Sequence, residues 1–486
     1  MKKVLVVITL TIVVLLAIVS YRASTEFQDR QVDPLSGITE IKLDNAGAIG
    51  RFSKALTIPT ISYDDRSHFD AEAFRDFRDF LQSAYPLVHQ HTERTTVNDH
   101  SLVFHLPGSD PALEPVLFMS HMDVVPIEEI SRDQWTHPPF SGVVEDGIIW
   151  GRGSVDDKIG VISLMEAMEL LLAENIQPKR SIYFAFGHDE EVGGKDGAAQ
   201  IAEFFLEKGT RFDFVLDEGG VVTEGMLLED HPVAIIGVSE KGYVNLVLTV
   251  DSAGGHSSQP PDQTAVGILS RAIVRVEDNP FPARLDYLYP TFEAIGSYAP
   301  FGNRMAMGNL WLFSNLVKKR MLSDSAQAAG IRTTIAATMF SGSPKANILP
   351  TRASAVINFR ILPGETVESV QQRVTQLIND DRVVVSEEFG NNPSEVSPTD
   401  SRGYKLIAGT IRGMDDNILV APYMVRGGTD AKFFYPLSSN VYRFLMIKVD
   451  PKTMKYVHGI DEHVAVEEYL RAIRFYYHLV RQSMAS

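Results

Sequence analysis

The residues best suited to chemistry in this sequence are imidazoles and carboxylates that follow short apolar runs. Residues 116–119 are apolar, and His121 and Asp123 follow them two positions apart, so on a strand both side chains face the same way. Two later apolar runs end in the same manner, at "GHDEE" and "LDEGG". Neighbouring buried carboxylates repel one another unless cations lie among them. With no cysteine in the chain, His and carboxylate ligands favour a pair of zinc ions that share a bridging carboxylate.

The elements that must position these groups alternate between strands and helices. We expect strands at "SLVFHLPG", "PVLFMSH", "RSIYFAFGHDEE" and "FDFVLDEGG", and helices at "DDKIGVISLMEAMELLLAEN" and "GAAQIAEFFLEKG". This alternation predicts an α/β fold with a mainly parallel sheet and helices on both faces. In such folds ligands bind beyond the carboxyl ends of the strands, where the polar groups stand.

The pattern changes near residue 243 and returns near residue 391. Alternating strands at "YVNLVLTVDS", "RTTIAATMFSG" and "RASAVINFRILPG" accompany helices at about 262–277 and at "TVESVQQRVTQLIND". A long stretch over 281–331, rich in Pro, Tyr, Phe and Gly, is expected to be irregular. We therefore predict an inserted α+β lid domain over 243–390, between the two parts of a catalytic domain, 38–242 and 391–486.

The composition is that of an ordered globular protein. The chain has 486 residues, 44% hydrophobic and 22% charged, and is too long for a single ordinary core. Its net charge of -17 argues against binding to nucleic acid, because a run of phosphates needs positive charge.

The first 22 residues indicate export from the cytoplasm. Two lysines precede an uncharged apolar stretch, Val4–Val19, and Arg22 follows it. This is either a cleaved signal peptide or an uncleaved signal anchor, and the stretch is near the lower length limit for crossing a bilayer. Both alternatives place the rest of the chain outside the cytoplasm, periplasmic or secreted, and an uncleaved segment anchors it to the membrane.

Taken in order, the motifs resemble those of a known family. They are "SHMDVVP", "GRGSVDDK", "GHDEEVGG", "LDEGG", "GGHSS", "NILP", "INFRILPGET", "GGTDAKFF" and "VHGIDE". Together they resemble the dinuclear-zinc metallopeptidase family that includes aminoacylase, succinyl-diaminopimelate desuccinylase and carboxypeptidase S. The likeness covers nearly everything after the apolar segment and is greatest to the carboxypeptidase S branch, which includes N-fatty-acyl-amino-acid synthase/hydrolases.

The resemblance implies a role for each strand-end residue. The ligands of two zinc ions, for which Co²⁺ or Mn²⁺ can substitute, would be His121, Asp156, Glu191, Glu218 and His458. Asp156 would bridge the two ions, and in relatives the peptide bond that follows it is cis. Asp123 would accept the second ring N–H of His121, and Glu190 would act as the general base. Asp217 is the alternative to Glu218 as a ligand.

The resemblance also implies how substrate is held. His256, in the lid, would donate a hydrogen bond to the oxyanion, and in dimeric relatives this histidine comes from the neighbouring subunit, so a homodimer through the lid is an expectation. The residues that would bind substrate are Asn347, Arg360, Gly428 and Thr429. An arginine can grip a free carboxylate with two parallel hydrogen bonds, which selects substrates with a free C-terminus.

Three functions remain in competition at this point. The first is a zinc-dependent carboxypeptidase acting on short peptides, and the second is a hydrolase or synthase of N-acyl amino acids, including fatty-acyl ones. The aromatic residues of the stretch over 281–331 are a hint of the second. A metal-free binding protein on the same fold is the third, and it predicts the loss of a ligand or the base, none of which is missing here.

Overall fold

The computed structural model describes residues 1–485, and its largest element is a mixed sheet of ten strands. The order is β1 (Glu93–Val97), β2 (Ser101–Leu106), β6 (Ile182–Gly187), β3 (Val116–His121), β7 (Phe214–Asp217), β17 (Val441–Arg443), β9 (Val233–Glu240), β8 (Val222–Thr223) and β18 (Lys448–Val449), with β16 (Leu419–Val425) also paired with β9. The central strands β6, β3, β7 and β17 are parallel to one another. The predicted α/β fold with a mainly parallel centre is confirmed.

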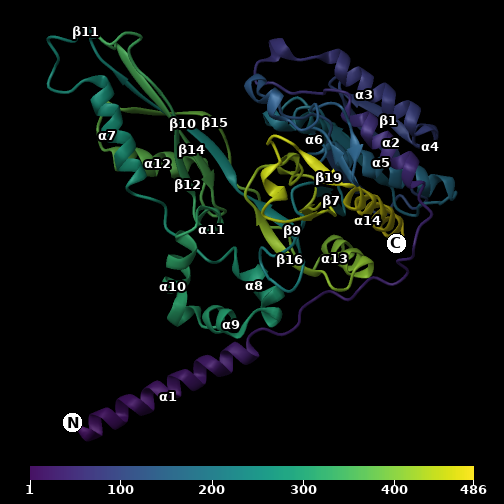
Figure 1. The fold of residues 1–486 in the computed structure, drawn as a ribbon, viewed down its shortest axis with the longest axis horizontal. Helices are drawn as coiled ribbons and strands as arrows, with labels where there is room; N and C mark the ends of the chain where they lie inside the picture. The colour runs from purple at the N-terminus through teal and green to yellow at the C-terminus, as the bar shows by residue number, and fades with distance from the viewer. Residues whose placement is uncertain (486) are drawn as a thin grey trace.

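Helices cover both faces of this sheet, and we call the sheet and these helices the body (Figure 1). One face carries α2 (Asn45–Leu56), α3 (Ala71–Ala84), α4 (Pro86–His91), α5 (Lys158–Ala173), α13 (Arg402–Met414) and α14 (Val466–Met484). The other carries α6 (Ala198–Glu207). Successive side chains of each central strand therefore point alternately into two apolar cores, one on each face of the sheet. A three-stranded sheet of β4 (Val144–Glu145), β5 (Ile148–Trp150) and β19 (His463–Ala465) joins early and late parts of the chain.

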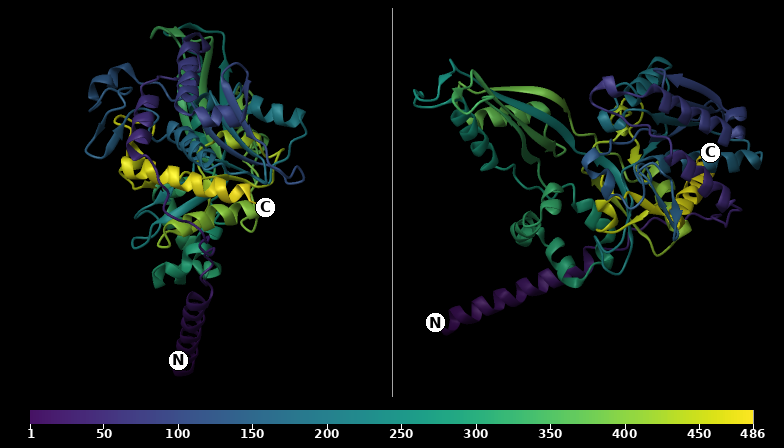
Figure 2. Two further views of the ribbon diagram at one scale, coloured as in Figure 1. Left: turned by 90° about the vertical axis from the view of Figure 1, so that its right-hand side faces the viewer. Right: turned by 45° about the horizontal axis from the view of Figure 1, so that its top comes forward.

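A second sheet projects from the body as a separate layer, the lid (Figures 1 and 2). Its order is β12 (Thr334–Ser341), β14 (Arg352–Ile361), β10 (Gly242–Asp251) and β15 (Val384–Asn391). Two helices, α7 (Ala265–Glu277) and α12 (Val367–Ile378), pack on one face and close an apolar core of their own. A small ribbon of β11 (Gly255–His256) and β13 (Ile348–Leu349) forms the end of the lid farthest from the body.

The stretch expected to be irregular contains four short helices, which we call the insert helices. They are α8 (Tyr289–Ile295), α9 (Phe301–Met307), α10 (Leu310–Leu322) and α11 (Ser325–Ala329). The expectation was wrong because α10 has no buried residue, so its sequence lacks the apolar stripe that signals a helix packed on a core. The helix α8 packs against the body beside β16, with Ile295 in a small core there.

The first helix, α1 (Lys2–Thr25), extends away from the body (Figure 1). Only Val19 and Ala23 of this helix are buried. It is long and apolar enough to cross a membrane, a property that signal sequences share.

Candidate metal centre

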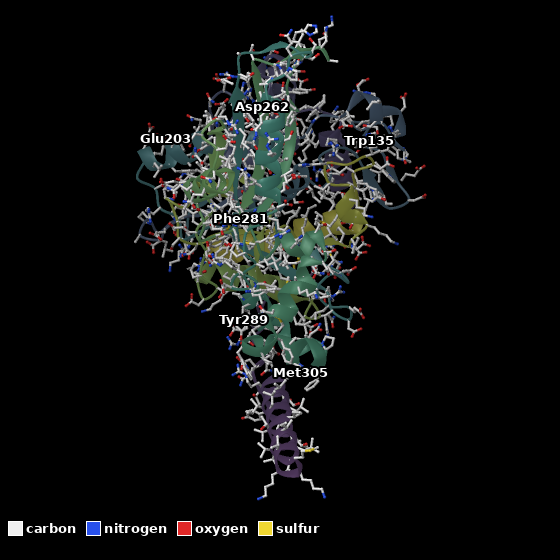
Figure 3. All side chains as sticks on the ribbon, turned by 90° about the vertical axis from the view of Figure 1, so that its left-hand side faces the viewer. Trp135, Glu203, Asp262, Phe281, Tyr289 and Met305 are labelled. Carbon is white, nitrogen blue, oxygen red and sulfur yellow. The ribbon has the colours of Figure 1, made fainter. Side chains whose placement is uncertain are left out.

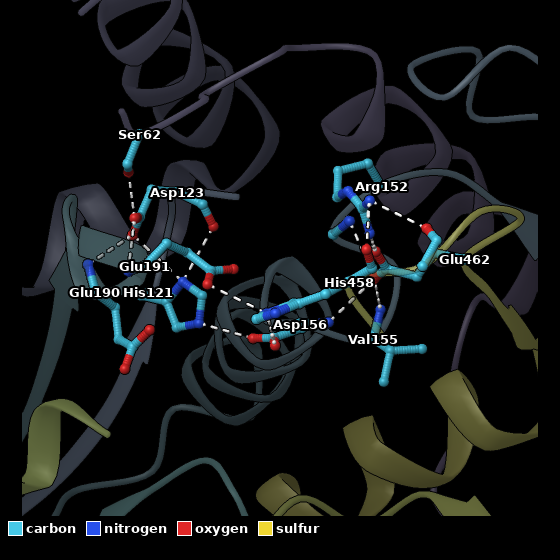
Figure 4. Close-up of polar contacts among 12 residues, drawn as sticks. Ser62, His121, Asp123, Arg152, Val155, Asp156, Glu190, Glu191, His458 and Glu462 are labelled. Atoms are coloured by element: carbon cyan, nitrogen blue, oxygen red, sulfur yellow. Dashed lines mark hydrogen bonds and ion pairs between the residues drawn. The ribbon is translucent and has the colours of Figure 1, made fainter. Parts of the chain in front are cut away.

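The end of β3 places the first imidazole beside a carboxylate from a distant loop. His121 is the last residue of β3 and is buried. Its Nε2 lies 3.0 Å from Oδ1 of Asp156, in the loop before α5. On the other side of the ring, Nδ1 lies 3.3 Å from Oδ1 of Asp123 and 3.0 Å from the Asp123 carbonyl oxygen (Figure 4).

Asp156 is shared by two groups of potential metal ligands. His121, Asp156 and Glu218 form one group, and Asp156, Glu191 and His458 form the other, each with ligand atoms within 4.8 Å of one another. Oδ2 of Asp156 lies 2.9 Å from Nε2 of His458, which in turn lies 3.2 Å from Oε2 of Glu191. All five residues proposed as ligands from the sequence therefore come together, with Asp156 in the middle. The peptide bond after Asp156 is cis, as the resemblance implied.

Two adjacent glutamates follow β6, and Asp123 fixes the turn that carries them. Oδ1 of Asp123 accepts the N–H of Glu190, and Oδ2 accepts the N–H of Glu191, each at 3.1 Å. Ser62 donates a further hydrogen bond to Oδ2. Asp123 thus contacts the His121 ring and also holds the backbone of the glutamate pair, a second task that the sequence did not indicate.

The geometry separates Asp217 from Glu218. Asp217 ends β7, is buried, and accepts the N–H of Ala431 at 2.7 Å. Glu218 is the one that belongs to a ligand group with His121 and Asp156. These contacts favour Glu218 as the ligand. Asp217 instead fixes the backbone of the segment that follows Thr429.

The electrostatics of the centre are those of excess negative charge. Burial and then the charge of Asp156 raise the pKa of Glu191 to about 7. Burial, followed by the charges of Asp156 and Asp157, raises the pKa of Glu218 well above its usual value. Burial also raises the pKa of Glu190. The charge of His121 lowers this pKa, and the charge of Asp430 raises it. Crowded carboxylates of this kind are expected where cations bind.

These residues fit a pair of divalent cations. The donors are imidazole nitrogens and carboxylate oxygens, a set that suits zinc and also cobalt or manganese. Within residues 1–485, Oε1 of Glu191 is buried and has no hydrogen-bond partner, and a bound cation would satisfy it. His121, Asp156 and Glu218 would hold one cation, and Asp156, Glu191 and His458 the other.

An ion pair that the sequence analysis missed ties the two ligand loops together. Glu462 is buried, and its Oε1 accepts the N–H groups of Val155 and Asp156 at 2.8 and 3.2 Å. Its Oε2 accepts from Nη1 of Arg152 at 2.6 Å, and Nη2 of Arg152 donates to the His458 carbonyl at 3.2 Å. The only signal for this role was the position of Glu462 inside the motif that contains His458.

A second missed carboxylate, Glu240, holds the loop that carries two of the expected substrate residues. Its Oε2 accepts the N–H and the hydroxyl of Thr429 at 3.1 and 3.0 Å, and Nε of Arg443 at 3.0 Å. Both donors of Thr429 are thereby engaged within the chain. The neighbouring Gly428 is exposed.

The structure does not bring every predicted residue to the centre. His256 and Asn347 lie together at the far end of the lid, where the Ser257 N–H donates to the Asn347 carbonyl at 3.2 Å (Figure 1). Arg360 lies at the opposite end of the lid sheet, paired with Tyr243 near the junction with the body. Its guanidinium carbon stands 4.8 Å from the centroid of the Tyr243 ring.

Metal affinity is expected to fall steeply as the pH falls. Hydrogen bonds to Asp156 and Glu191 raise the pKa of His458 to about 10. Burial lowers the pKa of His121, but Asp123 and Asp156 outweigh it and leave that pKa well above its usual value. Cations must displace these two protons and, below neutrality, also that of Glu191, so the product of the two zinc affinities should drop at least about a hundredfold per pH unit. Competition with a chelator at pH 6, 7 and 8 measures this, and a pH-independent affinity contradicts the ligand assignment.

The chain is similar to proteins of one family in its sequence and in its fold. The family described as Peptidase family M20/M25/M40 matches residues 117–482. A carboxypeptidase S-like protein of Dictyostelium discoideum is 36% identical over 459 residues, 93% of this chain and 87% of the relative. The N-fatty-acyl-amino acid synthase/hydrolase of Homo sapiens is 36% identical over 437 residues, 88% of this chain and 86% of the relative. A crystal structure of an M20 family metallo-carboxypeptidase from Sulfolobus solfataricus has the same fold, with a TM-score of 0.67 and 16% identity, covering 90% of this chain and 99% of the other.

Proposed function

The chain belongs to peptidase family M20/M25/M40 and is a hydrolytic enzyme, and from this premise we propose that it cleaves the amide bond preceding a free C-terminal amino acid. The observation that carries the proposal is the pair of ligand groups that share Asp156, with Glu190 beside the ligand Glu191. The apolar helix α1 supports an extracytoplasmic location, with the chain held at the membrane if that helix is retained.

Glu190 performs the proton transfers of the proposed reaction. Cations bound at the centre supply a Lewis acid for the amide carbonyl and an acidified water. The Glu190 carboxylate takes a proton from the attacking water and then delivers it to the leaving nitrogen, so that the acid and the amine are released. Burial raises the pKa of Glu190, which strengthens it as a proton acceptor. Asp123 keeps Glu190 in place through its backbone N–H.

Arg360 and the exposed backbone at Gly428 are the groups that we assign to the substrate carboxylate. The Arg360 guanidinium can form two parallel hydrogen bonds with a carboxylate, and its stacking on Tyr243 orients it. Thr429 has both donors engaged with Glu240, so we assign it the task of shaping the loop. A carboxylate held in this way sets the reaction one residue from the C-terminus.

His256 and Asn347 are assigned to the centre of a second copy of the chain. His256 is exposed at the end of the lid, and its Nδ1 accepts the Ser258 N–H at 3.1 Å. That contact leaves Nε2 as the protonated nitrogen, which is the form that can donate to an oxyanion. A homodimer through the lid would place each His256 over the partner's metal centre.

Complementation between two inactive variants tests this assignment. His256→Ala and Glu190→Gln should each lose at least about a hundredfold in kcat, because each removes a group that acts in the transition state. Co-expressed, they should recover about a quarter of the wild-type activity, since half of the dimers are mixed and each mixed dimer has one complete site. Activity no higher than that of the separate variants would show that His256 acts within its own chain.

The second candidate substrate is an N-acyl amino acid. It is favoured by the human relative named N-fatty-acyl-amino acid synthase/hydrolase, which is as similar as the carboxypeptidase S-like relative. Both substrates present the same amide and the same carboxylate, and they differ on the acyl side. A screen of blocked dipeptides and N-acyl amino acids, with the released amino acid read by mass spectrometry, tests the proposal. Release of N-terminal residues from unblocked peptides, with no C-terminal release, would overturn it.

A further inference from the structure

A large apolar cavity lies outside the metal centre, between the insert helices and the body. Its volume is about 740 Å³, within the range of small-molecule sites. Most of its lining is apolar, and the side chains include Leu288, Phe292, Met307, Leu316, Val317 and Met321. A single amino-acid side chain would leave most of this volume unfilled.

One wall of the cavity is formed by the chain segment that continues into the loop beside the metal centre. Tyr423, Met424 and Arg426 line it, and Nε of Arg426 donates to the Tyr423 hydroxyl at 2.8 Å. The chain then passes through the exposed Gly428 to Thr429, which Glu240 holds in place. One continuous segment of chain, residues 423–429, therefore borders both the cavity and the loop beside the metal centre.

The chain that directly follows the lining residue Met307 contacts the helix that is suited to cross a membrane. Nδ2 of the buried Asn309 donates to the carbonyl of Val19 at 3.1 Å, and Nε of Arg22 donates to that of Gly308 at 2.9 Å. Val19 ends the apolar run of α1. The insert helices therefore sit at the level where α1 would leave the bilayer, and Figure 3 shows Met305 and Tyr289 on the part of the molecule directly next to α1.

The surface of the insert helices has the composition of a membrane interface. Trp311 is 59% exposed and Leu316 is 62% exposed, and Lys318, Lys319 and Arg320 follow on the same helix. Tryptophan and basic residues favour the headgroup region of a bilayer. Because Leu316 both lines the cavity and is exposed, the cavity borders this surface.

We propose that this cavity binds the aliphatic chain of an N-acyl amino acid that enters from the membrane beside α1. The proposal rests on the amide hydrolysis proposed above and specifies the substrate class. Each methylene buried in the cavity should lower KM about threefold to fourfold, until the chain fills the available length. The amino acid and its carboxylate remain at the metal centre, where Arg360 and Gly428 are assigned to them.

The test uses the full chain in lipid nanodiscs and N-acylglycines from acetyl to hexadecanoyl. Ala306 lines the cavity, and Ala306→Trp fills it. Gly302 is on the same helix, and a Cβ added there meets nothing within 4 Å, so Gly302→Trp is the matched control. Ala306→Trp should raise the KM for dodecanoylglycine and longer substrates at least tenfold and change the KM for acetylglycine less than twofold. Gly302→Trp should change neither KM. Val317→Trp is a second filling variant if Ala306→Trp does not fold.

Three results overturn the cavity assignment while leaving the proposed function intact. In the first, the wild-type KM does not depend on the length of the acyl chain. In the second, Ala306→Trp and Gly302→Trp change KM equally. In the third, Ala306→Trp raises KM for N-acetyl amino acids with large side chains and not for long acyl chains, so that the cavity holds the side chain of the amino acid. If no amide is hydrolysed, the proposed function fails. Calorimetric measurement of dodecanoylglycine binding to Glu190→Gln then tests separately whether the cavity binds the acyl chain. Binding that Ala306→Trp weakens at least tenfold supports the assignment, and binding that Ala306→Trp leaves unchanged overturns it.

Discussion

Glu190→Gln should lower kcat by about a thousandfold to ten-thousandfold, with little change in metal content. The substitution keeps the size of the side chain and removes the group that accepts the proton of the attacking water, and a general base contributes this order of rate enhancement. A thousandfold loss corresponds to about 4 kcal/mol of transition-state stabilisation. Single-turnover kinetics and metal analysis of the same preparation measure both quantities.

The adjacent glutamate supplies the control. Glu191→Gln should lose activity together with metal, because Glu191 belongs to a ligand group with Asp156 and His458. The two substitutions are chemically identical and one residue apart, so a difference in metal content assigns their roles. A Glu190→Gln enzyme that retains more than a tenth of wild-type kcat would show that another group is the base.

Asp156→Asn should remove both metals and lower the activity by at least about a thousandfold. Asp156 is the residue that the two ligand groups share, and an amide is a weaker and uncharged ligand. Losing both cations removes several kcal/mol of charge stabilisation and the acidified water. Metal content by mass spectrometry and kcat on an N-acyl amino acid are the measurements.

His458→Gln is the comparison for this prediction. His458 belongs to one ligand group only, so this variant should keep about one metal per chain, held by the group that contains His121 and Glu218. Equal metal losses in Asp156→Asn and His458→Gln would contradict the shared position of Asp156.

Three of the expected ligands, His121, Glu191 and Glu218, were the easiest to propose, because they lie at or just after the ends of strands with a strong local signal. The apolar run before His121 is a buried strand, and the runs before Glu190 and Glu218 are its neighbours in the sheet. Parallel strands bring their carboxyl ends to one edge, so residues more than 90 positions apart meet there. His458 was placed by resemblance to a family, because a loop histidine has no periodic pattern.

Groups that act through hydrogen bonds were harder to foresee. Glu462 and Glu240 accept backbone and arginine donors from distant segments, and those pairings exist only after the chain has folded. A buried glutamate and a solvent-exposed one look the same in a sequence. The distance of His256 from the body was also beyond prediction, because it depends on how the lid is oriented.

The insert helices were missed for a different reason. The apolar side chains of α10 face the cavity or the outer surface, so the spacing of these residues follows no single stripe. The same feature that hid the helices is the one that suggests a lipid-facing role.

Anomalous scattering at the zinc edge, from crystals of the metal-loaded enzyme, would show whether two cations share Asp156. We expect two peaks per chain, one between His121, Asp156 and Glu218 and the other between Asp156, Glu191 and His458. A single peak, or peaks that Asp156 does not contact, would contradict this expectation.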